Sequence, residues 1–154
     1  MTTSSAQFRP LTRCDVQAMV AIENEVANSP WSSGLMKDAI AIGHNQVWGA
    51  FMGDTLLGFA VISKVMDEAE LLSIAVAEQY QRQGWGEKLL NMLIEQLQFQ
   101  KVESFFLEVR ASNIQAQKFY KKCGFTKIYE RTDYYPGLGG GPREAAFVLQ
   151  RILK

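Results

Sequence analysis

Residues 71–90 read LLSIAVAEQYQRQGWGEKLL, and this stretch decides the fold. Residues 71–76 are apolar at nearly every position, which is typical of a strand covered on both faces of a sheet. Two glycines, Gly84 and Gly86, then precede leucines at helical spacing. Glycines let a ligand approach the backbone closely, and the unpaired N–H groups of a helix N-terminus favour an anion. The stretch therefore predicts a central strand, a tight turn and a helix start that fits a pyrophosphate.

Two common phosphate-binding motifs do not match this turn. A dinucleotide-binding loop needs a third glycine, and position 89 is Leu89. A mononucleotide P-loop needs Gly-Lys-Ser/Thr, and Gly86 is followed by Glu87. The alternative to a phosphate site is a turn that serves only close packing.

Periodicity and capping residues predict further elements on both sides of this stretch. Upstream they indicate a strand at 8–11, a helix at 13–27 that starts at a Thr12–Asp15 capping box, and a short helix capped by Ser32 or Ser33. They also indicate a hairpin of 45–52 and 55–65 with Gly53-Asp54 at its turn. Downstream they indicate a helix at 84–101, a strand at 105–109, a helix capped by Asn113, and strands at 126–135 and 145–153. The order β, α, α, β, β, β, α, β, α, β, β predicts an α/β fold of α+β type, a central mixed sheet flanked by helices. The segment 136–142 is expected to be a flexible connection.

Length and composition exclude several classes of protein. The 154 residues carry 16 Lys+Arg and 16 Asp+Glu, and 47% are hydrophobic, which predicts one globular domain over 1–154 without disorder or nucleic-acid binding. Cys14, Cys123 and His44 are too few and too scattered for a zinc site, so no metal is expected. No leader-like segment or long apolar run occurs, so we expect a cytoplasmic protein with no membrane contact.

The order of elements and two motifs resemble a known family. The spacing Gln81-x-x-Gly84-x-Gly86, after a strand ending in Ile-Ala-Val at 74–76, resembles the coenzyme A pyrophosphate loop of the GNAT acetyltransferases. The segment LEVRASN at 107–113 is similar to the bacterial ribosomal-protein-alanine N-acetyltransferase (RimI) family. The same resemblance extends to DEA at 67–69, FY at 119–120, CGF at 123–125 and YYP at 134–136, and it covers about residues 9–153.

The resemblance implies a reaction and a set of site residues. Glu108 would accept a proton and Tyr120 would donate one, as acetyl moves from acetyl-CoA to the N-terminal alanine of small-subunit ribosomal protein eighteen by direct attack. The residues implied to contact acetyl-CoA are Ile74, Ala75, Val76, Arg82, Gln83, Gly84, Trp85, Gly86, Glu87 and Asn113. Two of them depart from the family pattern, because basic residues are frequent where this chain has Gln83 and Glu87. We therefore expect the departures to affect cofactor affinity.

These residue types suit the chemistry on independent grounds. An N-terminal amine has a pKa of about 7.7 to 8.0, so a base must remove a proton before attack. Glu108 can do so directly or through a water, and the apolar residues beside it in its strand are expected to desolvate it. Tyr120 can protonate the departing thiolate, and backbone amides of residues 74–76 can bind the developing oxyanion.

Structural and functional alternatives accompany each of these residues. Glu108 could simply pair with Arg110, Tyr120 could be a core residue, and Asn113 could be only a helix cap. Cys123 is expected to be core, and Trp31, Tyr134 and Tyr135 either pack or line an acceptor groove. For the whole chain, the alternatives are a GNAT enzyme acting on other N-termini, lysines or small amines, and a coenzyme A binding module without turnover.

Overall fold

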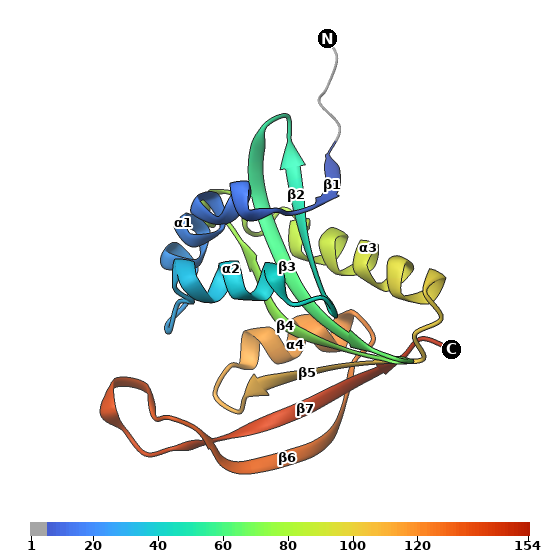
Figure 1. Cartoon of the computed structure of the whole chain (residues 1–154). Helices are drawn as coiled ribbons and strands as arrows, with labels where there is room; N and C mark the ends of the chain where they lie inside the picture. The colour runs from blue at the N-terminus through green and yellow to red at the C-terminus, as the bar shows by residue number, and fades with distance from the viewer. Residues whose placement is uncertain (1–5) are drawn as a thin grey trace.

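The computed structural model describes residues 6–154, which form one seven-stranded sheet with helices on both faces (Figure 1). The sheet order is β1-β2-β3-β4-β5-β7-β6, and only the β4–β5 pair is parallel. The strands are β1 Gln7–Pro10, β2 Asn45–Met52, β3 Thr55–Val65, β4 Glu68–Val76, β5 Ser104–Arg110, β6 Thr126–Tyr135 and β7 Glu144–Ile152. The helices are α1 Val16–Val26, α2 Ser33–Ala41, α3 Trp85–Phe99 and α4 Ile114–Lys122. The predicted order of elements and the fold class are confirmed.

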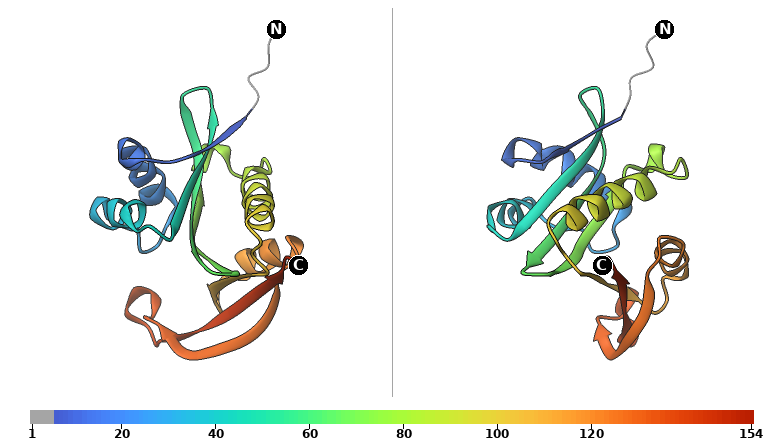
Figure 2. Two further views of the ribbon diagram at one scale, coloured as in Figure 1. Left: turned by 45° about the vertical axis from the view of Figure 1, so that its right-hand side comes forward. Right: turned by 90° about the vertical axis from the view of Figure 1, so that its right-hand side faces the viewer.

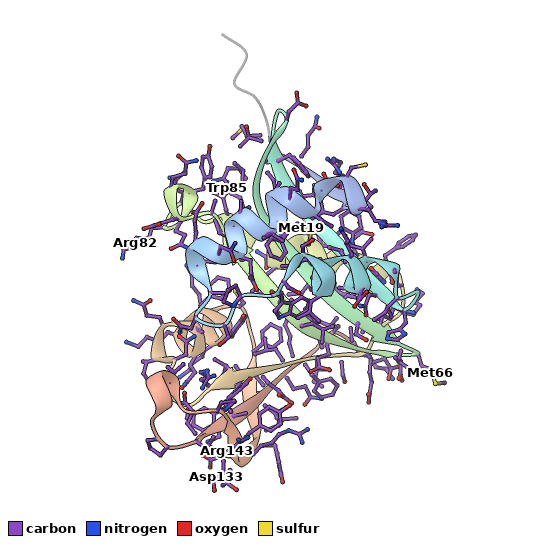
Figure 3. All side chains as sticks on the ribbon, turned by 60° about the vertical axis from the view of Figure 1, so that its left-hand side comes forward. Met19, Met66, Arg82, Trp85, Asp133 and Arg143 are labelled. Carbon is purple, nitrogen blue, oxygen red and sulfur yellow. The ribbon has the colours of Figure 1, made fainter. Side chains whose placement is uncertain are left out.

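The helices divide between the two faces of the sheet. Helices α1 and α2 cover one face, and α3 and α4 lie on the other (Figure 2). Met19 of α1 is fully buried in the first of the two resulting cores (Figure 3). Leu89, Leu93 and Leu97 of α3 are fully buried in the second. The leucine periodicity downstream of the glycine turn therefore marks the face of α3 that packs on the sheet.

Local capping and turn signals fix the N-terminal third. Thr12 and Asp15 form the predicted capping box, with the Asp15 side chain accepting the Thr12 N–H at 2.8 Å. Ser32, the first of the two predicted candidates, caps α2 by accepting the Leu35 N–H at 3.1 Å. Strands β2 and β3 form the predicted hairpin, and Gly53 takes the left-handed φ of 59° that the tight turn requires.

Strand β4 lies in the middle of the sheet and bends where it leaves β5. It pairs with β3 along its length, but an extra residue, Leu72, interrupts the register between Leu71 and Ser73. The parallel ladder with β5 ends at the same point, with Leu71 opposite Leu107. A bulge of this kind bends and twists a strand. The ends of β4 and β5 therefore diverge and open the sheet next to the start of α3.

The last two strands form a long, curved hairpin at the edge of the sheet (Figures 1 and 2). Its connection, expected to be flexible, contains a short 3-10 turn at Leu138–Gly140. Arg110 of β5 ties the base of this connection by donating to the Pro136 carbonyl at 2.8 Å and pairing with Glu144 at 2.9 Å. Across residues 6–154, the structure contains no helix with the length and hydropathy needed to cross a membrane.

Candidate active site

A pocket of about 490 Å³ lies where β4 parts from β5, between the start of α3 and one side of α4. All the residues implied to contact acetyl-CoA line it, with the exception of Gln83. The others are Ile74, Ala75, Val76, Arg82, Gly84, Trp85, Gly86, Glu87 and Asn113. The Gln83 side chain instead donates to the Gln79 carbonyl at 3.2 Å. The fold thus brings residues from three separate segments of the chain to one pocket.

The turn before α3 has the backbone geometry of an anion site. Gly84 caps the helix with a φ of 84°, a left-handed conformation that side chains disfavour. The first intrahelical bond runs from Lys88 N–H to the Gly84 carbonyl, so the amides of residues 85–87 precede the helical ladder. Gln81 steadies the turn by donating to the Val76 carbonyl at 3.0 Å. Free amides at the positive end of a 15-residue helix suit a pyrophosphate.

Charges at the mouth of this pocket are partly compensated. Arg82, which also has a positive φ of 62°, contributes a cation to the lining and lies in the turn just before Trp85, the first residue of α3 (Figure 3). Glu87, one of the two departures from the family pattern, pairs with Lys122 of α4 at 3.2 Å. The Glu87 carboxylate therefore partly neutralises the Lys122 ammonium, which could otherwise bind an anionic ligand.

Tyr120 lies on the side of α4 that faces this pocket. Its ring packs edge-on against Phe119 and Phe125, with centroid distances of 5.2 and 5.9 Å. Burial raises the pKa of Tyr120 to about 12, so the hydroxyl stays protonated at neutral pH. Tyr120 thus combines core packing with a place in the pocket lining. Asn113 also has two roles, because it caps α4 by accepting the Ala116 N–H at 3.1 Å.

Glu108 faces the other side of the sheet. It lines a trough of about 440 Å³ over β4, β5 and β6, while its strand neighbours Leu107 and Val109 are buried in the α3 and α4 core. Its carboxylate lies 3.3 Å from Arg131 Nε of β6. The alternative of a pair with Arg110 is not formed, since Arg110 pairs with Glu144.

The surroundings of Glu108 are mixed, because charged and aromatic groups join the apolar residues that line the trough. The Tyr134 ring of β6 lies 5.6 Å from the Arg131 guanidinium, and interaction with the Glu108 carboxylate is the main cause that raises the pKa of Tyr134. Glu70 of β4 lines the same trough, and its pKa is raised by burial and then by the Glu108 charge. Alternate residues of a strand point to opposite faces, so only Phe106 among the apolar strand neighbours of Glu108 lines the same trough, while Leu107 and Val109 point into the core.

A third cleft, of about 660 Å³, separates the α1–α2 connection from the β6–β7 connection. Asn28 and Ser29 line one side of it, and residues 135–139 with Arg110 line the other. Tyr135 is therefore a groove residue, whereas Trp31 packs against the α1 and α2 core and donates its backbone N–H to the Glu23 carboxylate at 2.9 Å. Cys123 is buried as expected.

Sequence reasoning missed several residues of these sites. Phe119 and Lys122 line the coenzyme-side pocket together with Tyr120, and their spacing on α4 is the signal that could have found them. Arg131 and Glu70 were not identified, because their contacts with Glu108 depend on strand pairing between distant segments.

Comparisons with known proteins agree with this geometry. Residues 16–125 match the acetyltransferase (GNAT) family. The [ribosomal protein bS18]-alanine N-acetyltransferase of Haemophilus influenzae is 38% identical over 136 residues, covering 88% of this chain and 91% of the relative. The N-alpha-acetyltransferase RimI of Mycobacterium tuberculosis is 35% identical, covering 86% of each chain.

A solved structure has the same fold over nearly the whole length. The crystal structure of the ribosomal-protein-S18-alanine N-acetyltransferase from Escherichia coli superposes with a TM-score of 0.90 at 32% identity. The match covers 97% of this chain and 95% of that protein.

Proposed function

Because this chain belongs to the acetyltransferase (GNAT) family, we propose that it transfers acetyl from acetyl-CoA to the N-terminal alanine of ribosomal protein bS18. Residues 1–154 would act as one catalytic domain in the cytoplasm, without a metal. The observation that carries the proposal is the placement of Glu108 and Tyr120 on opposite sides of the point where β4 and β5 diverge. An acceptor amine and a thioester can meet there from the two faces of the sheet.

The residues of the coenzyme-side pocket fit acetyl-CoA. Gly84 exposes the first amides of α3 to a pyrophosphate, and Arg82 adds a positive charge. When bound, acetyl-CoA supplies an acetyl group activated as a thioester. The free edge of β4 at residues 74–76 can donate backbone N–H groups to the thioester oxygen as it gains negative charge.

Glu108 is the proposed proton acceptor. The ammonium form of an N-terminal amine has no lone pair for attack, so one proton must move to the Glu108 carboxylate, directly or through a water. The negative trough around Glu108, which also carries Glu70, attracts the cationic form of the acceptor to this face. The role of Arg131 and Tyr134 is to hold the carboxylate in place through the contacts described above.

Tyr120 is the proposed proton donor. As the new N–C bond forms, the C–S bond breaks and leaves a thiolate, which takes the Tyr120 hydroxyl proton. The attacking nitrogen loses its second proton as the amide forms, and this proton restores the Tyr120 hydroxyl. Burial keeps that proton in place, since it raises the Tyr120 pKa to about 12. No covalent bond to the enzyme is needed, because amine and thioester react within one ternary complex.

The test is release of thiol from acetyl-CoA with three matched acceptors. They are a peptide with a free N-terminal alanine, the same peptide blocked at its terminus but carrying internal lysines, and a polyamine. Turnover confined to the free terminus supports the proposal. Equal rates on the blocked peptide would instead identify a lysine acetyltransferase, and tight acetyl-CoA binding without turnover would identify a binding module.

A further inference from the structure

The pairing of β6 with β7 is interrupted beside the trough that holds Glu108. Arg131 lies opposite Ala146 and Tyr135 lies opposite Glu144, so three residues of β6 face one residue of β7 between these two pairs. Within this bulge, Asp133 has a φ of 50°, in the left-handed region that non-glycine residues rarely adopt. A conformation of this kind costs free energy and persists only where other contacts hold it.

Arg143 supplies those contacts. Its Nε donates to the Asp133 carbonyl and its Nη2 donates to the Tyr134 carbonyl, each at 2.9 Å. A bulge takes backbone groups out of the strand ladder, and the fork of a guanidinium can serve two such carbonyls at once. Arg143 and Asp133 lie together on the hairpin, far along the molecule from Arg82 and Trp85 (Figure 3).

The bulge determines which side chains reach Glu108. Arg131, at its start, lies 3.3 Å from the Glu108 carboxylate. The ring of Tyr134, within the bulge, lies 5.6 Å from the same Arg131 guanidinium and packs edge-on against Tyr135 at 5.0 Å. Successive residues of a regular strand point to opposite faces. Without the bulge, Arg131 and Tyr134, which are three positions apart, would therefore lie on opposite faces of the sheet.

We propose that Arg143 is a positioning residue for the acetyl transfer: by holding the Asp133–Tyr134 backbone, it keeps the Tyr134 ring and the Arg131 guanidinium beside the carboxylate of Glu108. This inference rests on the proposed function of Glu108. Arg143 itself touches neither substrate nor the reacting atoms, so its effect passes through Tyr134. Its neighbour Glu144 has a separate role, since it pairs with Arg110 and accepts the Ser112 N–H at 3.1 Å.

A kinetic cycle tests this coupling. We expect Arg143→Ala and Tyr134→Phe each to lower kcat/KM for the acceptor peptide about tenfold, as expected when a catalytic group is misplaced. In the Tyr134→Phe background, Arg143→Ala should then cost less than about twofold, because residues that act as a unit are not additive. KM for acetyl-CoA should not change. In Arg143→Lys, whose ammonium can reach one of the two carbonyls, kcat/KM for the peptide should lie between the values of the wild type and Arg143→Ala. Equal losses in both backgrounds would overturn the proposal.

A titration tests the same contact without turnover, and so separates this proposal from the proposed function. The charged and titratable groups facing the Tyr134 hydroxyl are Glu108, Glu70 and Arg131. The difference in tyrosinate absorbance between a protein and its Tyr134→Phe counterpart isolates the ionisation of Tyr134. Arg143→Ala should lower that midpoint toward the ordinary value, and an unchanged midpoint would contradict the proposal. Arg13→Ala, which removes another exposed arginine, is the matched control and should change neither measurement.

Discussion

Arg131 Nε lies 3.3 Å from Glu108 Oε1, on the face of the sheet opposite the coenzyme-side pocket. The side chain of Arg131 is 49% exposed and that of Glu108 is 20% exposed. A pair so open to solvent contributes no more than about 1 kcal/mol to folding. The contact therefore orients the carboxylate more than it stabilises the fold.

Glu108→Gln should impair chemistry without impairing folding or cofactor binding. Loss of a general base lowers kcat by about 10²- to 10⁴-fold. Acetyl-CoA affinity, measured by calorimetry, should be unchanged, because Glu108 does not line the coenzyme-side pocket. Full activity in the variant would exclude Glu108 as the proton acceptor.

The buried tyrosines should make the protein sensitive to alkali. Burial raises the pKa of both Tyr120 and Tyr135 to about 12, so the folded state retains protons that the unfolded state releases above about pH 10. Their contribution to stability is present below pH 10 and is lost as the pH rises toward 12. In Tyr120→Phe, the fall in unfolding free energy between pH 9 and pH 11 should be smaller by roughly 1 to 1.5 kcal/mol. Denaturant titrations at pH 9 and pH 11 provide the measurement, and identical falls in both proteins would refute the assignment.

Gly84→Ala should weaken acetyl-CoA binding. A Cβ at a φ of 84° strains the helix cap, at a cost of about 1 to 2 kcal/mol. The strain should move the first amides of α3, so we expect KM for acetyl-CoA to rise several-fold while KM for the peptide stays constant. Gly43→Ala is the control, because a Cβ at Gly43 meets nothing within 4 Å and its φ is ordinary. A rise in KM for both substrates would argue against a specific role of the cap.

Glu87→Gln should tighten acetyl-CoA binding by a few-fold. The change frees Lys122, now 3.2 Å from the Glu87 carboxylate, and removes a negative charge from the pocket lining. The gain should shrink as ionic strength increases. Glu95→Gln, at an exposed position later in the same helix, should have no such effect. Weaker binding in Glu87→Gln would show that the carboxylate supports the ligand.

Glu70→Gln should stabilise the fold at neutral pH by less than about 1 kcal/mol, since the side chain is partly solvated. Burial and the Glu108 charge raise the Glu70 pKa, so the folded state disfavours the ionised form. The contribution of Glu70 to folding stability is therefore fully present at pH values below its pKa in the unfolded chain. It is lost as the pH rises through the raised pKa of the folded state. The advantage of the variant should disappear below about pH 4. Melting temperatures at pH 4 and pH 7 test this, and an equal advantage at both would contradict it.

Short-range signals were sufficient for most of the fold. The Thr12–Asp15 capping box, the Gly53 turn and the leucines of α3 each depend on residues within a few positions of one another. Such patterns are readable because capping bonds and helical faces are local. The cluster around the coenzyme-side pocket was likewise predictable, since it follows from one strand, one turn and one helix start.

The acceptor face depended on pairings that no local pattern encodes. The extra residue Leu72 opens the gap between β4 and β5, and the bulge of β6 brings Arg131 and Tyr134 to Glu108. Both features arise from register shifts between strands, and the second joins positions more than twenty residues apart. The apolar strand neighbours of Glu108 divide between the trough and the core for the same reason, because face and register decide what a strand residue meets.

The N-terminal alanine amine is the proposed acceptor of the acetyl group. Tandem mass spectrometry can locate the acetyl group on one peptide, with a free N-terminal alanine and internal lysines, after limited reaction with the wild-type enzyme and acetyl-CoA. We expect a single acetyl group on the fragment that contains the N-terminal nitrogen. Acetylation of a lysine side chain with the terminus left free would contradict it.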